Sequence, residues 1–275
     1  MAKKEQKEMS FLDHLEELRW MLVRSSIAIL VFTILSLFIS DFILNQIIFG
    51  PTEPDFVTYR FFCKVTQAFG MEDAEICNAT MPFKIQNTDM SGQISFWIWT
   101  SFTFGIILGF PFVLWQIWKF IKPALYEQEK KLAIPFILTS SGLFFLGVLF
   151  GYFIITPLSV YFFGNFQAST KIINEFNLDS YTGMVKTSVL ACGIVFELPI
   201  IIYFLSKLGL VTPDFLRKSR KYALILVLLL SAIITPPDVI SQIIVAIPIM
   251  ILYEISILIS VLVIKKEAKN KLIKT

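Results

Sequence analysis

Glu197 is a carboxylate in an unusual place. It lies about 14 residues into an apolar run, within the sequence Phe196-Glu197-Leu198-Pro199. An ionised carboxylate at that depth of a membrane costs about 3 kcal/mol unless it is paired, hydrated or protonated, so such a residue is a functional candidate by default. The alternative is a protonated glutamate that only hydrogen-bonds to a neighbouring helix, and the residues alone leave both interpretations open.

Two further glutamates, Glu17 and Glu129, lie in polar segments beside apolar runs. Glu17 precedes Arg19 by two residues, and Glu129 has no basic residue four positions after it with which to form a helical ion pair. A carboxylate near Phe120 and Leu125 could accept a guanidinium in bidentate fashion. The alternative is a charge that simply faces water.

Other catalytic chemistry has little support in the sequence. His14 is the sole histidine, and there is no HExxH, GxSxG or GxxxxGKS/T motif. We therefore expect no enzyme activity, metal, cofactor or nucleic-acid partner. Cys63 and Cys77 could form a disulfide on the oxidising side of a membrane, but spacing alone leaves both the bonded and the free state open. Cys192, inside an apolar run, fits a small buried hydrophobe.

The composition is that of a membrane protein. Of the 275 residues, 56% are hydrophobic and only 16% are charged, against about 25% charged in soluble proteins. This composition excludes a soluble enzyme, a disordered tail protein and a disulfide-stapled secreted domain. A bilayer span needs roughly 17–25 residues. Five apolar runs have about this length, at Met21–Ser40, Ile94–Trp118, Leu132–Thr156, Met184–Ser206 and Val239–Ile264, and a shorter sixth lies at Tyr222–Thr235. The prediction is an all-α fold of six transmembrane helices.

The basic residues indicate the orientation of these spans. Nineteen of the 24 lysines and arginines lie in the N-terminal segment, the second and fourth connections and the C-terminal tail. Basic residues are retained on the cytoplasmic side. The sequence therefore predicts one polytopic membrane domain over 1–275 with both termini inside, 265–275 being a basic cytoplasmic tail. The Tyr222–Thr235 run must then be a span, although its helix of about 21 Å is short for a bilayer of about 30 Å.

Three connecting segments have predicted structure of their own. Residues 10–20 predict an amphipathic helix that rests at the inner interface before the first span, since Phe11, Leu15 and Leu18 share one face. The connections 41–93 and 157–183 lie outside, and we expect them to form a structured external cap.

Four sequence blocks occur together in an order known from one family. They are His14-Leu15-Glu16-Glu17-Leu18-Arg19, the run from Phe120 to Tyr126 followed by Glu129, Phe196-Glu197-Leu198-Pro199, and Thr235-Pro236-Pro237-Asp238-Val239-Ile240-Ser241-Gln242. The first is similar to an H-L-x-E-L-R signature and the second to F-x-x-P-A-L-Y-x-x-E. Together the blocks resemble the TatC family, the polytopic core of the twin-arginine protein translocase.

This resemblance implies a fold, a place and a role. The fold would be a concave, cupped bundle of six helices with an external loop cap, in the bacterial cytoplasmic (inner) membrane. The role would be a non-enzymatic receptor that binds twin-arginine signal peptides of folded cargo proteins. Its partners would be single-span TatA/TatB-type subunits and membrane lipids, in a homo- or hetero-oligomer.

The resemblance also implies roles for individual residues. Glu17 and Glu129 would receive the arginine pair, and Arg19 would brace the site. Its shape would come from Phe120, Pro123 and Leu125. The intramembrane polar residues would contact partner helices; these are Glu197, Thr235 and Gln242.

Two alternatives to a receptor remain from the residues alone. A proton- or ion-coupled secondary transporter would use Glu197, whereas an intramembrane hydrolase lacks a nucleophile or metal set. The short fifth span would thin the bilayer locally, at a cost of fractions of a kcal/mol per Å, and we expect this thinning to help cargo pass.

Overall fold

The computed structural model describes residues 11–68, 70, 77, 81–122, 133–169, 171, 173–235 and 239–272. The chain divides into two compact units. The first contains Met1–Ser40 and Ile98–Ser141, and the second contains Asp41–Trp97 and Gly142–Thr275.

Within the described part of the chain, five helical segments are long and apolar enough to cross a membrane. They are Leu12–Phe38, Gly92–Ile121, Ile134–Asn165, Leu178–Lys207 and Ser241–Lys266. The predicted fifth span corresponds to helix α10 (Arg220–Ile234), whose 15 residues make it shorter than those five. The protein is thus a largely helical membrane protein, and a sixth crossing stays a prediction.

The first helix, α1 (Phe11–Phe38), joins two predicted elements into one. The sequence predicted a separate interfacial helix over 10–20 before a span at Met21–Ser40. No glycine or proline interrupts residues 11–38, so nothing breaks the hydrogen-bond ladder between the two. The polar first turns therefore continue directly into the apolar part.

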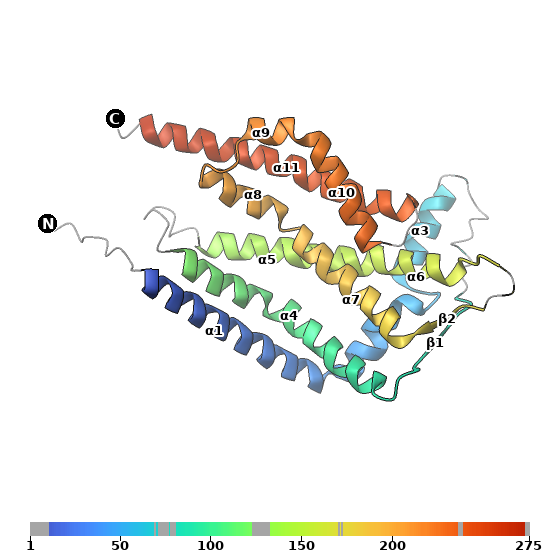
Figure 1. Ribbon diagram of the computed structural model, residues 1–275. Helices are drawn as coiled ribbons and strands as arrows, with labels where there is room; N and C mark the ends of the chain where they lie inside the picture. Colours follow the sequence, from blue (N-terminus) through green and yellow to red (C-terminus); the bar gives the residue numbers. More distant parts are fainter. Residues whose placement is uncertain are drawn as a thin grey trace. The chain divides into compact units, whose positions relative to one another are not determined.

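In the first unit, α1 runs alongside α4 (Gly92–Ile121), as Figure 1 shows in dark blue and green. The two backbones approach closely at Gly105, where an added Cβ would lie 2.2 Å from Thr33 Oγ1 and 2.8 Å from the Thr33 backbone nitrogen. In a membrane no hydrophobic driving force holds two helices together, because lipid is as apolar as their side chains. Small residues at the contact let the helix backbones approach closely and gain van der Waals contact. The α1–α4 pair is the scaffold for the cavity described below.

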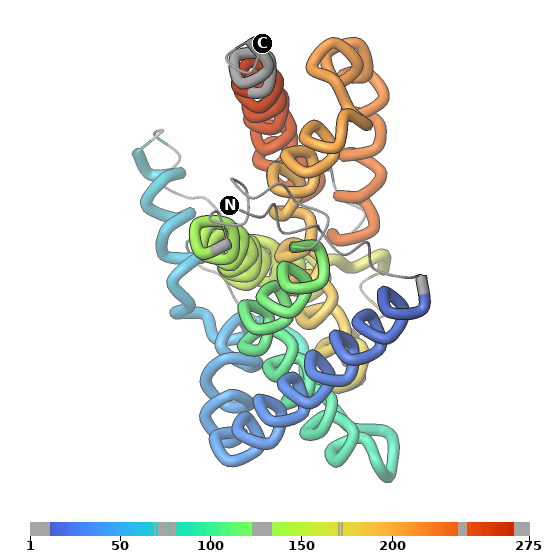
Figure 2. The backbone as a smooth tube through the Cα atoms, turned by 90° about the vertical axis from the view of Figure 1, so that its left-hand side faces the viewer, coloured from blue at the N-terminus to red at the C-terminus, as the bar shows by residue number. Residues whose placement is uncertain are grey.

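The second unit is a bundle of shorter helical pieces. It contains the end of α5 (Ala133–Phe150), the π-helical turn η6 (Gly151–Ile155), α6 (Thr156–Asn165), α7 (Leu178–Val195), α8 (Leu198–Lys207), α9 (Pro213–Lys218), α10 and α11 (Val239–Leu272). Figure 2 shows the orange and red tubes of α8, α10 and α11 grouped together. Cys192 is buried in an apolar cluster with Ile155 and Val245, which confirms its prediction as a small core residue.

Polar bonds tie α11 to its neighbours in this bundle. Ser206 of α8 donates to Ser260 Oγ at 2.7 Å. Arg220, at the start of α10, pairs with Glu254 of α11 at 2.7 Å. Glu254, in the apolar part of α11, therefore has a cationic partner on α10.

The third and fourth predicted spans are too short at the two ends that border the connection between them. Helix continues through η6 and α6 to Asn165, and α7 already begins at Leu178, so the connection is 166–177 and not 157–183. Pro157 cannot donate to the Phe153 carbonyl four residues before it, but the Thr58 hydroxyl donates to that carbonyl instead, and the helix continues. At the other side, Asn177 caps α7 by accepting from the Asp179 backbone N–H at 2.9 Å.

The described residues of the first long connection, 41–93, form helices and one strand, and the strand departs from the all-α prediction. It contains α2 (Ser40–Phe42), η1 (Ile43–Ile48), η2 (Gly50–Thr52), α3 (Val57–Ala68) and strand β1 (Lys84–Gln86). Strand β1 pairs in parallel with β2 (Glu175–Asn177), with Ile85 opposite Phe176. A short sheet therefore links the two long connections, and neither strand has the length or alternation that would have predicted it.

Tyr59 anchors α3 to the rest of the second unit. Its buried hydroxyl donates to the carbonyl oxygens of Pro51 at 2.8 Å and Pro157 at 3.0 Å. Burial raises the pKa of the Tyr59 phenol, so this donor keeps its proton.

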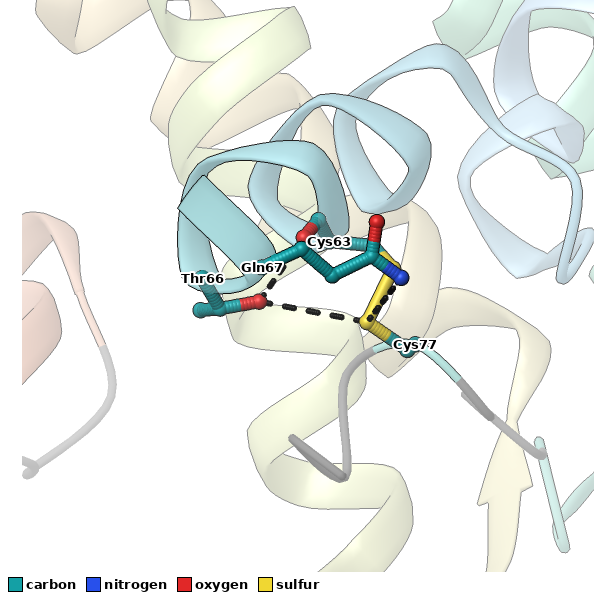
Figure 3. Close-up of a disulfide and its surroundings, with 4 residues drawn as sticks. All are labelled: Cys63, Thr66, Gln67 and Cys77. Atoms are coloured by element: carbon teal, nitrogen blue, oxygen red, sulfur yellow. Dashed lines mark hydrogen bonds between the residues drawn. A yellow bond between two sulfur atoms is a disulfide. The ribbon is translucent and has the colours of Figure 1, made fainter. Parts of the chain in front are cut away.

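A disulfide joins Cys63 of α3 to Cys77, as Figure 3 shows. Two α3 side chains lie against the Cys77 sulfur, Thr66 through Oγ1 at 3.8 Å and Gln67 through Nε2 at 3.9 Å. Of the two states left open by the sequence, the structure has the bonded one.

Candidate functional site

Charged and aromatic side chains of α1 and α4 line an open cavity of about 400 Å³ in the first unit. This volume is within the range of about 300–1,000 Å³ that small-ligand sites occupy. The lining consists of Asp13, Glu16, Glu17, Trp20, Met21 and Arg24 from α1, and Gln116, Lys119 and Phe120 from α4. We call it the α1–α4 cavity.

Helical spacing explains why these α1 residues share the cavity. Asp13, Glu17, Trp20 and Arg24 follow one another at intervals of four, three and four residues, so they fall on one face. The acidic members lie near the helix N-terminus, where negative charge is favoured by the helix dipole. The apolar residues on the other side of this helix, such as Leu22, are exposed.

Glu17 presents a buried carboxylate oxygen to this cavity. Its Oε2 is buried and has no hydrogen-bond partner among the residues that the structure describes. Buried carboxylate oxygens are normally satisfied by donors, because the desolvation cost is otherwise large. The arrangement has acceptor capacity for a cationic ligand.

The two cations of the cavity are held by aromatic rings. Lys119 Nζ lies 4.1 Å from the centroid of the Trp115 ring, and the Arg24 guanidinium lies 5.9 Å from that of Trp20. Within the described ranges, neither forms an ion pair with a carboxylate. Neither cation therefore neutralises Glu17.

His14 stacks on Phe120, with ring centroids 4.4 Å apart and an angle of 25° between the planes. The contact joins the start of α1 to the end of α4. It brings together the two sequence blocks that begin at these residues.

The predicted signal-peptide residues have three outcomes. Glu17 and Phe120 come together in the α1–α4 cavity. Arg19 is exposed and does not line the cavity. The other three, Pro123, Leu125 and Glu129, lie outside the described residues.

Sequence reasoning missed several residues of the lining. Asp13, Trp20 and Arg24 could have been found from their helical spacing to Glu17. Gln116 carried a weaker signal, as a single amide in the apolar run that ends α4.

Glu197 lies at a break in the fourth span. The chain leaves helix at Phe196, and α8 starts at Leu198 with Pro199 in its first turn. Because proline has no N–H to donate, the ladder of α7 cannot continue through this point. Glu197 is 8% exposed and follows a segment that packs on the core cluster of the second unit. The sequence predicted one span over Met184–Ser206 and did not mark this break.

Thr235 and Gln242 make bonds within the α10–α11 pair. Thr235 Oγ1 donates to the Ser231 carbonyl at 2.8 Å, and Gln242 Nε2 donates to the Leu228 carbonyl at 3.0 Å. Pro236, Pro237 and Asp238 between them lie outside the described residues. Over the described part of the chain, no group of three histidine, cysteine, aspartate or glutamate residues could hold a metal ion.

Comparison with known proteins gives consistent matches. The family described as Sec-independent protein translocase protein (TatC) matches residues 13–248. The chain is 42% identical over 265 residues to the Sec-independent protein translocase protein TatC of Blattabacterium sp. subsp. Periplaneta americana (strain BPLAN), covering 96% of this chain and 100% of that one. It is 32% identical over 270 residues to TatCy of Bacillus subtilis (strain 168), covering 98% and 96%.

Solved structures give the same result. A crystal structure of the twin arginine translocase receptor TatC in DDM is similar with a TM-score of 0.69 and 33% identity, covering 90% of this chain and 99% of that one. A second crystal structure of the twin arginine translocase receptor TatC has a TM-score of 0.65 and 33% identity, covering 91% and 99%.

Proposed function

Because this chain belongs to the TatC family of Sec-independent protein translocase proteins, we propose that it is the receptor that binds twin-arginine signal peptides. As a family member it is a membrane component of protein transport and not an enzyme. With single-span TatA/TatB-type subunits it would export folded proteins. The proposed setting is a bacterial inner membrane, with six crossings and both termini in the cytoplasm.

The observation that carries the proposal is the buried Glu17 oxygen that has no hydrogen-bond partner among the described residues. A guanidinium is always charged and presents planar pairs of N–H donors, which match a carboxylate better than an ammonium does. Glu16 and Asp13 add negative charge in the same cavity. We assign Glu17 to one arginine and Glu129 to the other, with Phe120, Pro123 and Leu125 shaping the site.

Arg19 has a different place in the proposal. Because it is exposed and does not line the cavity, we assign any bracing role of Arg19 to its contacts with the bound peptide. It would then touch the peptide beside the arginine pair and not inside the cavity.

The second unit supports a role in partner contact. Glu197 is nearly buried at a helix break, and a break in a membrane helix frees backbone groups for other partners. We propose that Glu197, Thr235 and Gln242 contact a single-span partner helix. The comparisons give no support to the alternative of a proton- or ion-coupled transporter that uses Glu197.

The external features fit the same orientation. Disulfides persist on the oxidising side of a membrane, and Cys63–Cys77 lies in the segment assigned to the outside. We propose that 41–93 and 166–177, joined by the β1–β2 pair, form the external cap.

Peptide binding tests the proposal directly. The full chain in lipid nanodiscs should bind a twin-arginine peptide, and Glu17→Ala or Glu129→Ala should each weaken binding by tenfold or more. This loss is expected because a charge-assisted hydrogen bond contributes about 1.5–3 kcal/mol. Replacing both peptide arginines by lysine should have a similar effect. Binding that is indifferent to all three changes would contradict the site. Solute movement by the purified chain in liposomes would favour the transporter.

A further inference from the structure

Gln116 is a buried amide with no polar partner in the described part of the chain. Its side chain is 3% exposed, on the last turns of α4, yet it lines the α1–α4 cavity. The described residues give it no hydrogen bond. Its amide nitrogen and oxygen are not fully buried, so the carboxamide is open to the cavity and can bind a ligand there.

Two polar groups thus face one cavity from two helices, and of the two only the Glu17 oxygen is both fully buried and without a partner among the described residues. Glu17 supplies a carboxylate oxygen from α1, and Gln116 supplies a carboxamide from α4. The nearest competing cation, Lys119, is one turn from Gln116 and is held over the Trp115 ring. A ligand that satisfies both groups must donate hydrogen bonds in two directions at once.

We propose that Gln116 determines specificity for arginine in the bound signal peptide. Its carboxamide oxygen accepts from a guanidinium N–H that is not engaged by Glu17. This inference rests on the proposed function and adds to it a residue on α4. Gln116 recognises the planar shape of the guanidinium, whereas Glu17 recognises its charge.

The chemistry explains why arginine is preferred over lysine at this position. A guanidinium has five N–H donors in one plane, so two can bind a carboxylate and others remain for an amide oxygen. An ammonium is a compact point charge without a planar set of donors. An ammonium bound to Glu17 therefore has no donor directed at the Gln116 acceptor on the other helix. Removal of the Gln116 acceptor should therefore cost an arginine ligand more than a lysine ligand.

The experiment measures peptide affinity by fluorescence polarisation with the full chain in nanodiscs. Four peptides are compared, which carry Arg-Arg, Lys-Arg, Arg-Lys or Lys-Lys at the paired positions. Gln116→Leu removes the acceptor while keeping the volume, and Gln116→Glu keeps an acceptor. Gln93→Leu, the same change at the exposed other end of α4, is the matched control.

The expected result has a specific pattern. Gln116→Leu weakens the Arg-Arg peptide about tenfold, and weakens one of the single-lysine peptides by less than twofold, because that peptide lacks the guanidinium that Gln116 contacts. Gln116→Glu restores or strengthens Arg-Arg binding, whereas a structural role for Gln116 would make a buried charge worse than leucine. Gln93→Leu has no effect.

Two results would overturn the inference. One is an equal loss for all four peptides with Gln116→Leu and no rescue by Gln116→Glu. The other is Arg-Arg binding that depends on Glu17 but not on Gln116, which would leave the proposed function standing. Failure of the unmodified chain to bind Arg-Arg at all would instead contradict the proposed function itself.

Discussion

Lys119 could neutralise a carboxylate of the α1–α4 cavity by forming an ion pair with it, but its ammonium lies over the Trp115 ring instead. A lysine side chain is long enough to reach a carboxylate across a small cavity, but Lys119 Nζ lies 4.1 Å from the indole centroid. A cation over an aromatic face gains about 0.5–2 kcal/mol, depending on how far it is desolvated. That contact competes with an ion pair to Glu17.

We therefore predict that Trp115→Leu weakens twin-arginine peptide binding severalfold. Without the ring, Lys119 is free to pair with the cavity carboxylates and to compete with the ligand. Removing both groups, with Trp115→Leu and Lys119→Met together, should restore affinity to at least the original level. Trp99→Leu, at another exposed tryptophan of α4, serves as the control. Equal losses in the single and double variants would show that Trp115 acts through packing alone.

At this scale the sequence singled out Glu17 and Phe120 because both lie in blocks with a defined pattern, and the structure brings them to one cavity. Their role in peptide binding stays a prediction. The sequence could not predict that Arg19 lies outside the cavity or that Gln116 lies inside it. Arg19 is two residues from Glu17, which turns it about 200° around the helix, away from the Glu17 face. Gln116 lines a cavity only because α1 packs against α4, and this packing cannot be predicted from the residues around Gln116.

The α1–α4 contact is the element on which the cavity depends. At Gly105 even a methyl group would meet Thr33 Oγ1 at 2.2 Å and backbone atoms of α1 at 2.8–2.9 Å. The contact atoms include backbone, which cannot rotate away as a side chain can. Any side chain at position 105 must push the two helices apart.

We predict that Gly105→Ala lowers both the thermal stability and the peptide affinity. Overpacking of this kind costs typically about 1–3 kcal/mol, and the displaced helices carry the cavity residues with them. Gly142→Ala is the matched control, since an added Cβ there meets nothing within 4 Å, and alanine favours helix by about 1 kcal/mol over glycine. If the two variants behaved alike in thermal melts, the close contact would have no energetic role.

The start of the short helix α10 is held at a defined point along α11. Its first residue, Arg220, pairs with Glu254 of α11. The candidate span on α11 continues from there to Lys266, twelve residues or about 18 Å of helix further on. The basic start of α10 therefore lies well short of the end of the α11 span.

We expect that lengthening α10 by one turn impairs export. Four apolar residues inserted after Leu224 would move the basic start away from Glu254 and remove the local mismatch that the short helix imposes on lipid. Export of a folded twin-arginine reporter measures the effect. Four residues inserted after Gln167, in the exposed connection, are the control. Unaltered export with the longer α10 would remove the idea that thinning helps passage.

Element boundaries were less predictable than element identity. The apolar runs located the long helices, but the helix ends that border 166–177 were missed because Asn165, Asp179 and Tyr181 lower the hydropathy of helical turns. The break at Glu197 was marked only by Pro199. The β1–β2 pair has three residues in each strand, and its pairing depends on a fold of the external segments that no local pattern encodes.

For the molecule as a whole, the number of membrane crossings decides whether the two termini lie on the same side of the membrane. Five long spans alone would leave the two termini on opposite sides of the membrane. The charge distribution places the basic C-terminal tail on the same side as the basic N-terminal segment. Both can hold only if α10 also crosses, short as it is.

We predict that α10 crosses and that the C-terminal end lies in the cytoplasm. The test uses a chain with Cys63→Ser, Cys77→Ser and Cys192→Ala, to which Lys266→Cys or Ser169→Cys is added. In intact spheroplasts an impermeant maleimide should label the Ser169→Cys chain, on the external connection, and should reach the Lys266→Cys chain only after the membrane is permeabilised. Export by the unlabelled parent chain shows that the background changes preserve the fold. Labelling at position 266 in intact spheroplasts would mean that α10 turns back without crossing, and the charge asymmetry would then need another cause.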